Sequence, residues 1–509
     1  HQERPVKLRS TSIAFAFLLL ACATAVAAEL RTSAPEAQGV PSQSVQTFIE
    51  TLEKEVDAPH GIVIVRHGHV IAQGWWSPYQ RDGTHMLYSL SKSFTSTAIG
   101  MLADEGKIDI DAPVLSFFPD DGPKEPSANL KAMRVRDLLS MNTGHHNDTL
   151  AALTQGGDDN WPRRFLSLEV EHHPGTHFRY NTGATYMCSA ILQKITGKTV
   201  LEYLTPRLFK PLGIEKPTWE NDPKGVNVGG WGLKVTTQDI ARFGQLYLQR
   251  GEWEGKRLLS ANWVALASAA QTDNGTNPDS DWNQGYGFQF WRCRHNGFRG
   301  DGAFGQFCIV MPDQNAVIAI TAGQGDMQKT LNLIWEHLLP AMKDGALPAN
   351  KSAADALAKK LASLNHPTVK GDAKSALAAK VSGKVFTLED NAAKLKSVAL
   401  AIDGAKTTLV LTTEQGEQRF AIGFDAWATS DVMFHKLGIP IAATTAMQPV
   451  AASGAWTSGD TFTIRAWLTE TPFRLDVSLK FSDDGRSVTL STRMHPMQGK
   501  AMEIKGTAK

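Results

Sequence analysis

The sequence predicts an α+β protein with two domains, and two observations support this fold class. Up to about residue 345, segments with helical spacing are interspersed with short β-branched runs. Beyond about residue 368, strand-like runs follow one another with Gly, Asp and Asn turns between them, which is typical of an antiparallel β-sandwich or small barrel. The length of 509 residues also favours more than one core.

The composition is that of an ordinary globular protein. Hydrophobic residues make up 42% and charged residues 20% of the chain. The 52 basic side chains are matched by 51 acidic ones, which gives a formal net charge of +1. No basic block stands out, so neither nucleic acid nor an anionic membrane surface is an expected partner.

The N-terminal segment has the composition of an export signal. Lys7 and Arg9 precede an apolar run over residues 13–28, which ends in ATAVAA and is shorter than a membrane-spanning helix requires. We therefore expect residues 1–28 to be a signal peptide, the processed protein to be periplasmic or secreted, and no transmembrane span to remain. Cys22 lies in LLAC, which loosely resembles a lipobox, so a lipid anchor at Cys22 on an outer-membrane lipoprotein is the alternative.

The first domain is expected over residues 29–345, and its elements follow in a definite order. Helical spacing predicts helices over residues 41–56, 89–106, 133–144, 183–197 and 235–251. β-branched runs predict a hairpin over residues 60–76 and strands in YGFQFWRC and QFCIVMPDQNAVIAIT, between residues 286 and 321. Residues 346–367 indicate a linker with one alanine-rich helix, and residues 368–509 are expected to form the β domain.

The stretch YSLSKSFTSTAIG (88–100) places a hydroxyl beside an amine. Ser89 and Lys92 are three residues apart at the start of a predicted helix, so their side chains share one face. A serine hydroxyl needs a base within hydrogen-bond reach, and desolvation can lower the pKa of a lysine enough to serve. S-x-x-K alone occurs by chance in many chains, and the alternative is the hydroxyl-rich first turn of a buried helix.

Further motifs follow this stretch in order. They are SLSKSFTS (89–96), GKIDIDAPV (106–114), VRDLLSMNTG (135–144), PGTHFRYNTGATY (174–186), GWGLKVTTQDIARFG (230–244) and DGAFGQF (301–307). Together they resemble the serine β-lactamase and penicillin-binding-protein superfamily, above all the branch with class C β-lactamases, family VIII carboxylesterases, D-aminopeptidases and 6-aminohexanoate-oligomer hydrolases. The resemblance covers about residues 40–340. It implies a β-lactamase/transpeptidase-like catalytic domain, with an antiparallel sheet, helices and an all-α region, in which Ser89 is the nucleophile and Lys92 its base.

The family's second motif, Tyr-x-Asn, is matched in part by Tyr180-Asn181-Thr182. The resemblance implies that Tyr180 is a base or proton shuttle beside the lysine. Thr182 replaces the motif's amide, so it is a candidate substrate contact whose role is in doubt. The alternative for Tyr180 is simple packing beneath the loop that follows residues 174–175.

The family's third motif, Lys-Thr-Gly or His-x-Gly on a strand, falls on Gly300-Asp301-Gly302, where the cation is missing. Arg299 could replace that cation, although its side chain should point to the other side of the strand. Asp301, Gly302 and Arg299 are therefore expected substrate-binding residues. By the same resemblance, the backbone N–H of Ala303 joins that of the nucleophile in an oxyanion hole.

No cofactor and no metal site are expected. Residues 300–305 match G-x-G-x-x-G, but strand rather than helix follows, which excludes a dinucleotide loop. The histidine pairs at 145–146 and 172–173 lack H-E-x-x-H spacing and lie in loop-like sequence. Cys293 and Cys308 could form a disulfide or remain buried thiols, and the sequence leaves both open.

The expected function is that of an exported serine hydrolase acting on small esters or amides through an acyl-enzyme on Ser89, with Lys92 and Tyr180 as its base system. A true β-lactamase or a D-Ala-D-Ala-type peptidase is the alternative among enzymes. A non-catalytic penicillin-binding or sensor module is the alternative outside them. Because the third motif lacks its cation, we expect neutral esters to be better substrates than anionic β-lactams.

Overall fold

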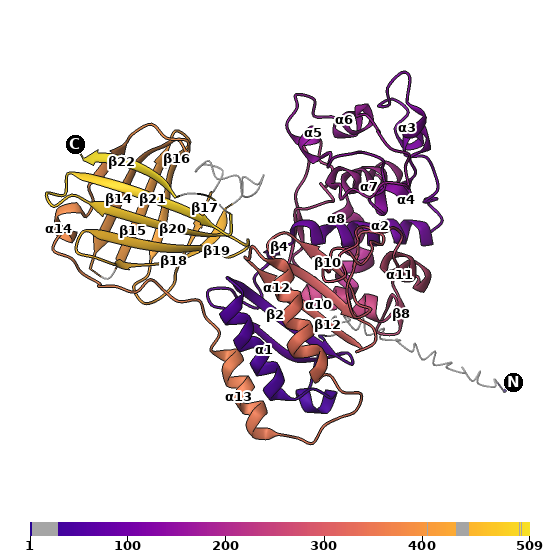
Figure 1. Cartoon of the computed structure of the whole chain (residues 1–509), viewed down its shortest axis with the longest axis horizontal. Coiled ribbons are helices and arrows are strands. Elements are labelled where there is room, and N and C mark those ends of the chain that lie inside the picture. Colours follow the sequence, from indigo (N-terminus) through magenta and orange to yellow (C-terminus); the bar gives the residue numbers. More distant parts are fainter. Residues whose placement is uncertain (3–28, 405, 434–446, 498, 500, 509) are drawn as a thin grey trace.

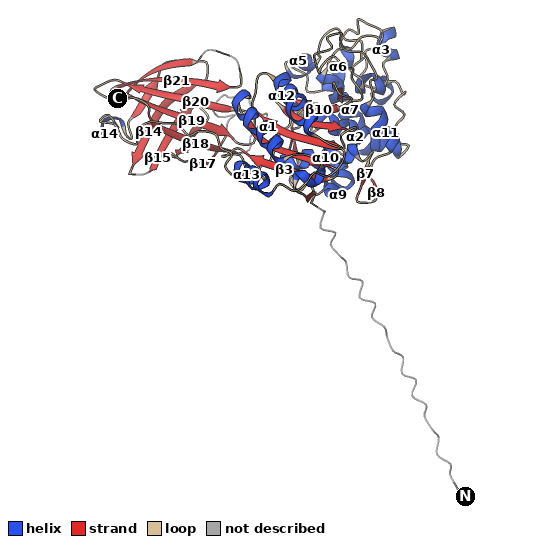
Figure 2. Ribbon diagram, turned by 60° about the horizontal axis from the view of Figure 1, so that its bottom comes forward, coloured by secondary structure: helices blue, strands red, loops and turns tan. Residues whose placement is uncertain are grey.

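The computed structural model describes residues 1–2, 29–404, 406–433, 447–497, 499 and 501–508. Within these residues the chain forms two domains that lie side by side (Figures 1 and 2). The expected signal peptide, including Cys22, lies outside the described residues apart from its first two. Among the described residues, no helix combines the length and the apolar character needed to cross a bilayer.

The N-terminal domain is built around a seven-stranded sheet with the strand order β1-β3-β2-β12-β11-β10-β9. Only β1 and β3 pair in parallel. In sheet order, the strands are Arg31–Thr32, His69–Trp75, Pro59–Arg66, Ala316–Ala322, Gln306–Met311, Phe298–Gly302 and Trp291–Arg292. Because β2 pairs with β12, the sheet joins the beginning of the domain to its end.

Helices cover both faces of this sheet, which explains the nearly continuous apolar sequence of β2. Ile62 and Ile64 face one side of the sheet, and Val63 and Val65 face the other. The isoleucine side is covered by α1, α12 and α13, and the valine side by α10 (Figure 1). The bounds of these helices are Ser42–Glu55, Met327–Leu333, Lys351–Ala362 and Thr237–Leu248.

Two buried helices, α2 (Ser91–Asp104) and α7 (Thr182–Thr196), pack together in the helical part of the domain. Both are buried over most of their length, so neither sequence has the polar stripe of a surface helix. Shorter helices surround them: α3 (Ala128–Ala132), α4 (Val135–Leu139), α5 (Leu150–Thr154), α6 (Trp161–Ser167), α8 (Val200–Leu204), α9 (Lys210–Leu212) and α11 (Ala261–Ser268). Two small sheets complete the domain: β4 (His85–Met86) with β5 (Thr218–Trp219) and β6 (Leu233–Val235), and β7 (Glu252–Trp253) with β8 (Lys256–Arg257).

The segment YGFQFWRC differs from its prediction, because only the short strand β9 forms there. The reason lies on α2, where the Ser93 and Ser96 hydroxyls donate to the carbonyls of Gln289 and Phe288 at 2.8 and 2.7 Å. Those carbonyls are therefore bound by a helix and not by a neighbouring strand. The hydroxyl-rich face of α2 thus has a structural use.

The expected linker also differs from its prediction. Its helix α13 packs on α1, with Leu357 buried in the same apolar cluster. Lys360 of α13 forms an ion pair with Glu53 of α1. The helix therefore belongs to the N-terminal domain, and the connection between the domains begins after it.

The C-terminal domain is one ten-stranded antiparallel sheet with the order β16-β15-β14-β13-β22-β21-β20-β19-β18-β17. In that order, the strands are Gly416–Ile422, Lys406–Thr413, Leu395–Asp403, Val385–Leu388, Met502–Ala508, Ser487–His495, Arg474–Phe481, Thr461–Leu468, Gln448–Trp456 and Ala428–Val432. Gly423 links the two ends of the sheet, since its N–H donates to Ala452 and its carbonyl accepts from Gly454, at 3.1 and 2.9 Å. The sheet thus curls into a nearly closed barrel, as the barrel-like prediction required.

The turn between β19 and β20 reaches from the barrel to the N-terminal domain. Glu470 in this turn accepts a hydrogen bond from Lys234 Nζ at 2.7 Å, and its backbone carbonyl accepts from Met86 N at 2.8 Å. Phe473, at the end of the turn, packs against Tyr88. The two domains are therefore joined by both charged and apolar contacts.

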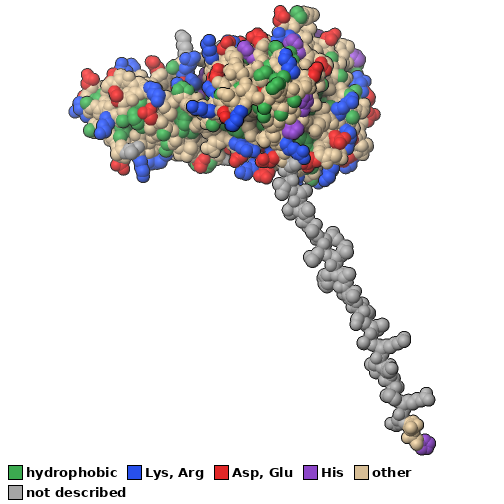
Figure 3. All heavy atoms as spheres, turned by 90° about the horizontal axis from the view of Figure 1, so that it is seen from below, with side chains coloured by type: hydrophobic (Ala, Val, Ile, Leu, Met, Phe, Trp, Pro, Cys, Tyr) green, Lys and Arg blue, Asp and Glu red, His purple; other side chains and the backbone are tan. Residues whose placement is uncertain are grey.

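Basic and acidic side chains are interspersed on the face of the molecule that Figure 3 shows. This distribution agrees with the nearly balanced composition of the chain. It gives no support on that face for a surface specialised to bind a polyanion.

Candidate active site

The candidate nucleophile lies in a tight turn at the start of α2. Ser89 is the middle residue of the 3₁₀ turn η2 (Tyr88–Leu90), which leads directly into the helix. Tyr88 has a φ of 48°, a left-handed conformation that is rare for a large side chain and is often found at functional sites. The Tyr88 ring is held by the rings of Phe304 and Phe473, whose centroids lie 5.5 and 6.4 Å away.

Lys92 faces the nucleophile from the first turn of α2. Its Nζ lies 3.0 Å from Ser89 Oγ and donates hydrogen bonds to the Gly230 carbonyl at 2.8 Å and to Thr182 Oγ1 at 3.4 Å. The lysine is 1% exposed. The sequence-predicted pair of hydroxyl and amine is therefore brought together in the folded chain.

Burial changes the ionisation of this lysine. Desolvation lowers the pKa of Lys92 to about 7, although the carboxylates of Asp148 and Asp301 oppose the shift. Near neutral pH, a large fraction of such an amine is uncharged and able to accept a proton. A hydroxyl 3.0 Å away is within reach for that transfer.

Tyr180 lies just before α7, and its ring is close to Lys92. Its ring stacks on Trp291, with centroids 5.1 Å apart, and the ring centroid lies 4.9 Å from Lys92 Nζ. Burial raises the pKa of Tyr180 well above its usual value, the Asp301 carboxylate adds to the rise, and a hydrogen bond with Ser89 opposes it. At neutral pH this phenol therefore keeps its proton.

Thr182 connects the lysine to a carboxylate that the sequence analysis missed. The Asp148 carboxylate accepts hydrogen bonds from the Thr182 backbone N–H at 2.9 Å and from its hydroxyl at 3.1 Å. The same hydroxyl oxygen accepts from Lys92. The structure thus gives Thr182 a positioning role beside the lysine, whereas we expected a substrate contact.

Strand β10 packs closely against the nucleophile turn. A Cβ at Gly302 would lie 1.9 Å from the Leu87 carbonyl, and one at Gly300 would lie 2.5 Å from Leu90 Cδ1 and from Ser93 Oγ. Neither position has room for a side chain. The position where the family motif has its cation is therefore filled here by the nucleophile helix.

Arg299 does not take over the role of that missing cation. Its side chain is 0% exposed, Nε donates to Asp301 Oδ2 at 2.9 Å, and the guanidinium lies 4.3 Å from the centre of the Trp282 ring. A group that is enclosed and paired in this way is not available to a substrate carboxylate. The expectation that Arg299 anchors a substrate is therefore wrong. Its ion-pair partner, Asp301, is also buried.

The turn that carries Ala303 is held by a buried side chain. Ala303 is exposed and directly follows Gly302 at the end of β10. The buried Gln306 side chain donates to the Ala303 carbonyl at 3.1 Å and to the Ala322 carbonyl at 2.8 Å. The backbone beside Gly302 therefore lies close to the serine turn, where the sequence analysis expected an oxyanion hole.

The residues that the sequence did not reveal share one property. The fold brings them to the site from distant parts of the chain. The Gly230 carbonyl and the Asp148 carboxylate serve Lys92 from distant loops, and Trp291 supports Tyr180. Gly230 opens a motif that was noticed in the sequence, GWGLKVTTQDIARFG, but a backbone carbonyl leaves no signal of its own. Asp148 lies in a polar loop with no motif at all.

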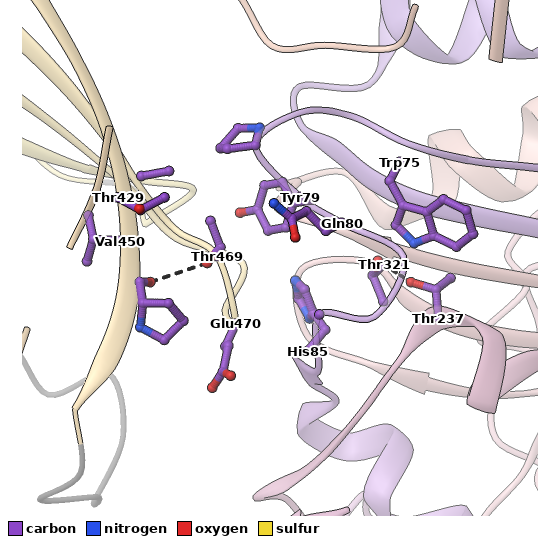
Figure 4. Close-up of a pocket in the computed structure, with 14 residues that line it drawn as sticks. Trp75, Tyr79, Gln80, His85, Thr237, Thr321, Thr429, Val450, Thr469 and Glu470 are labelled. Carbon is purple, nitrogen blue, oxygen red and sulfur yellow. Dashed lines mark hydrogen bonds between the residues drawn. The ribbon is translucent and has the colours of Figure 1, made fainter. Parts of the chain in front are cut away.

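The cysteines and a cavity lie outside this site. Cys293 and Cys308 are buried free thiols, which settles the alternatives left open by the sequence. A cavity of about 250 Å³ lies between the domains, with Tyr79 and His85 on one side and Glu470 on the other (Figure 4). None of the three catalytic candidates lines it, so it is separate from the site around Ser89.

A serine and a desolvated lysine at the start of a buried helix, beside a glycine-bearing strand, are the arrangement expected of a serine hydrolase. Comparison with known proteins identifies the family. A family model described as Beta-lactamase matches residues 48–338, more than half of the chain. The chain therefore belongs to the beta-lactamase family and is a serine hydrolase of that family.

Relatives are distant but cover most of this domain. The chain is 26% identical over 333 residues to the 6-aminohexanoate-dimer hydrolase of Paenarthrobacter ureafaciens, covering 60% of this chain and 83% of the relative. It is 23% identical over 318 residues to penicillin-binding protein 4 of Amycolatopsis lactamdurans, covering 55% and 82%. A solved structure from Bacillus anthracis, described as a candidate 6-aminohexanoate-dimer hydrolase, superposes with a TM-score of 0.51 at 21% identity and covers 63% of this chain and 89% of the other. That superposition confirms the transpeptidase-like fold.

Proposed function

We propose that the protein cleaves neutral esters or amides through an acyl-enzyme on Ser89, with Lys92 as the base and Tyr180 as the proton donor. The observation that carries this proposal is the Lys92 amine, whose pKa is lowered to about 7 and whose Nζ lies 3.0 Å from Ser89 Oγ.

In the first half of the reaction, Ser89 Oγ attacks the substrate carbonyl carbon and Lys92 Nζ takes the hydroxyl proton. The oxyanion is held by the backbone N–H groups of Ser89 and Ala303. The bond to the alcohol or amine then breaks, and the leaving group takes a proton from the Tyr180 hydroxyl, which is resupplied by Lys92. In the second half, water attacks the acyl carbonyl carbon while Lys92 takes its proton, and the bond to Ser89 breaks as that proton returns to Oγ, which releases the carboxylic acid.

The assignment of roles follows from the two pKa shifts. Burial drives the pKa of Lys92 down and that of Tyr180 up, so near pH 7 the amine accepts a proton more readily than a phenolate forms. Pairs of titratable groups with pKa values pushed apart are typical of acid and base partners. The two opposite pKa shifts therefore favour Lys92 over Tyr180 as the primary base.

The mechanism is tested with a p-nitrophenyl ester and a panel of variants. Ser89→Ala should reduce turnover to background, while Lys92→Ala and Tyr180→Phe should each lower kcat by at least ~100-fold, the usual effect of removing a base or acid. Ser96→Ala is the matched control, since this buried hydroxyl on the same helix donates its hydrogen bond to the Phe288 carbonyl, away from Ser89 and Lys92. Undiminished turnover in Ser89→Ala would refute the acyl-enzyme.

The preference for neutral substrates rests on charge. The cation of the third motif has no room at Gly300, and Arg299 is enclosed and paired. The carboxylates near Lys92, those of Asp148 and Asp301, disfavour a second negative charge. A charge-assisted contact contributes about 1.5–3 kcal/mol, so its loss should reduce capture of anionic substrates by about one to two orders of magnitude.

This preference is tested by comparing kcat/KM for p-nitrophenyl butyrate, a penicillin and the methyl ester of the same penicillin. We expect the butyrate to be the best substrate and the penicillin methyl ester to acylate Ser89 faster than the free acid. The esterified and free penicillins share one scaffold, so they isolate the effect of the carboxylate. Faster acylation by the free acid would reject the proposed selectivity and favour a β-lactamase or D-Ala-D-Ala-type peptidase.

The similarity to a penicillin-binding protein keeps a binding role as the second candidate. One equivalent of covalent label on Ser89 with no release of the acyl group from any ester would support that candidate. Export of the chain is a further part of our proposal and rests on the composition of residues 1–28 alone. Sequencing of the mature N-terminus in the native cell decides between a start near Glu29, a lipid-modified Cys22 and an unprocessed chain.

A further inference from the structure

Three histidines that are separate in the sequence come together on two neighbouring loops. His146 follows α4 in the chain, and His172 and His177 lie before α7. One ligand atom from each of them lies within 4.8 Å of the others. The histidine pairs at 145–146 and 172–173 were not expected to bind a metal, because their spacing is wrong for a site on a helix. In the structure, one histidine from each pair lies beside His177.

The closest pair of ligand atoms has the separation that a metal ion requires. His146 Nδ1 lies 3.5 Å from His172 Nε2. Two nitrogens bound at ~2.0–2.1 Å to a tetrahedral zinc ion are separated by roughly 3.3 Å. The rings of His172 and His177 lie face to face at 4.0 Å, and the soft torsion about the Cβ–Cγ bond lets them turn toward a shared ion.

A second observation points to a missing ligand. His177 Nε2 is buried and has no hydrogen-bond partner among the described residues. Buried ring nitrogens are normally satisfied, so this atom calls for a partner that the polypeptide does not provide. The carboxylate of Glu171 adds negative charge, since its Oε2 accepts a hydrogen bond from the His146 N–H at 3.0 Å and its charge acts on His177.

The two loops are already held in register by the backbone. His172 N donates to the Gly144 carbonyl at 2.9 Å, and Gly175 N donates to the Asn142 carbonyl at 2.8 Å. A Cβ at Gly144 would lie 2.2 Å from the His172 carbonyl, so the loops touch there. The ligands are therefore presented by a nearly preformed frame, which reduces the ordering cost of binding.

We propose that His146, His172 and His177 bind one divalent transition-metal ion of the zinc class, with water or Glu171 as the fourth ligand. Imidazole nitrogens suit zinc, copper and nickel. The ion would brace two segments that serve the catalytic site: the loop with His146 also carries Asp148, and the loop with His177 leads into Tyr180. None of the catalytic candidates is a ligand, so the ion acts as a structural brace and does not enter the chemistry at Ser89.

The test uses the full untagged chain after removal of metals with a chelator. Calorimetric titration with Zn²⁺ at pH 7.5 should give one site per chain with a Kd of about 10 µM or tighter, and Zn²⁺ should raise Tm. His146→Ala, His172→Ala and His177→Ala should each weaken binding by at least ~10–100-fold, the range known for disturbed metal sites. Co²⁺ should give the intense visible absorption of a tetrahedral complex.

His173→Ala is the matched control, because this neighbouring histidine uses Nδ1 to contact the Pro174 carbonyl and lies outside the cluster. It should bind zinc as the wild type does. If an alanine variant has a lower Tm in chelator, the corresponding His→Gln variant, which keeps more of the side-chain volume, replaces it. The proposal is overturned by wild-type protein that binds no zinc at about 100 µM, or by His173→Ala losing as much affinity as His146→Ala.

Discussion

Lys92 is buried where its charged ammonium form is costly, and this cost lowers its pKa. The side chain is 1% exposed and its Nζ is held by a backbone carbonyl and two hydroxyls. Solvent is thus unavailable to stabilise the ammonium form. Asp148 and Asp301 moderate this effect and keep the pKa close to neutrality.

The lowered pKa of Lys92 predicts the pH dependence of the reaction. A base must be unprotonated, so kcat/KM should fall as pH decreases through about 7 and should reach a plateau above it. Asp148→Asn removes a negative charge that raises the lysine pKa, so the acidic limb should move to lower pH. The measurement is kcat/KM for a neutral ester at a series of pH values from about 5 to about 9.

The same profile can contradict the assignment. A pH profile that is flat around 7, or an Asp148→Asn limb shifted toward higher pH, would mean that Lys92 is not the titrating base. Glu169→Gln is the control, because this exposed carboxylate precedes the adjacent loop and is not among the groups that shift the Lys92 pKa.

Single residues could be predicted from the sequence where their partners are close in the chain. Ser89 and Lys92 share one helical turn, so spacing alone brought them together. Asp148 and Arg299 show the limit of that reasoning. The distance from Asp148 to Lys92 and the enclosure of Arg299 depend on how loops and strands pack, which no local pattern encodes.

At the scale of elements, the turn before α2 depends on the barrel. Tyr88 and Phe304 both have positive φ, at 48° and 69°, and each is adjacent to a residue of the proposed oxyanion hole. Phe473 contacts both rings, at 6.4 and 5.4 Å between centroids. One side chain of the C-terminal domain therefore holds two strained backbone positions of the N-terminal domain.

Phe473→Leu should lower kcat by ~10-fold with a smaller effect on KM, because small displacements of reacting groups are costly in rate. It should also lower Tm, since a buried ring is replaced by a smaller side chain. The measurement is steady-state hydrolysis of a neutral ester together with thermal unfolding.

Phe462→Leu is the control for Phe473, as this ring is buried inside the barrel against Trp456. It should lower Tm without changing kcat. Equal kcat values in the two variants would show that the barrel does not support the nucleophile turn.

Helices and strands with clear periodicity were predicted well, and the exceptions have identifiable causes. The strand expected in YGFQFWRC was lost to hydrogen bonds from Ser93 and Ser96, which a period-two pattern does not reveal. Helix α13 was expected in a linker, but its Leu357 face found a partner in α1. Both errors arise from tertiary contacts that override local sequence preference.

For the whole molecule, the best anchored contact between the domains is charged. Lys234 Nζ donates to Glu470 at 2.7 Å and to Gln448 at 2.6 Å, and the lysine side chain is 9% exposed. The lysine end of this pair is shielded from solvent, so salt screens the pair less than it would an exposed one. Removing one partner leaves the other charge poorly solvated.

Glu470→Gln should therefore lower Tm and make the linker after α13 easier to cleave by protease, as the domains separate more readily. We expect a loss of about 1–3 kcal/mol in the free energy of unfolding. Calorimetry and limited proteolysis measure the two effects. Glu414→Gln, which breaks an exposed pair with Lys396, should leave both unchanged. An unaltered Tm in Glu470→Gln would mean that the apolar contacts alone hold the domains.

The pairing of β2 with β12 has a consequence for folding during synthesis of the chain. Ser89 and Lys92 leave the ribosome before strand β10, which leads to Ala303. Strand β12, the partner of β2, follows, and Phe473 comes later still. Contacts between such distant segments form slowly and only after the intervening chain is made. A nascent chain therefore carries Ser89 and Lys92 without the segments that complete their surroundings, and hydrolytic activity begins only after the segment with Phe473 has been made.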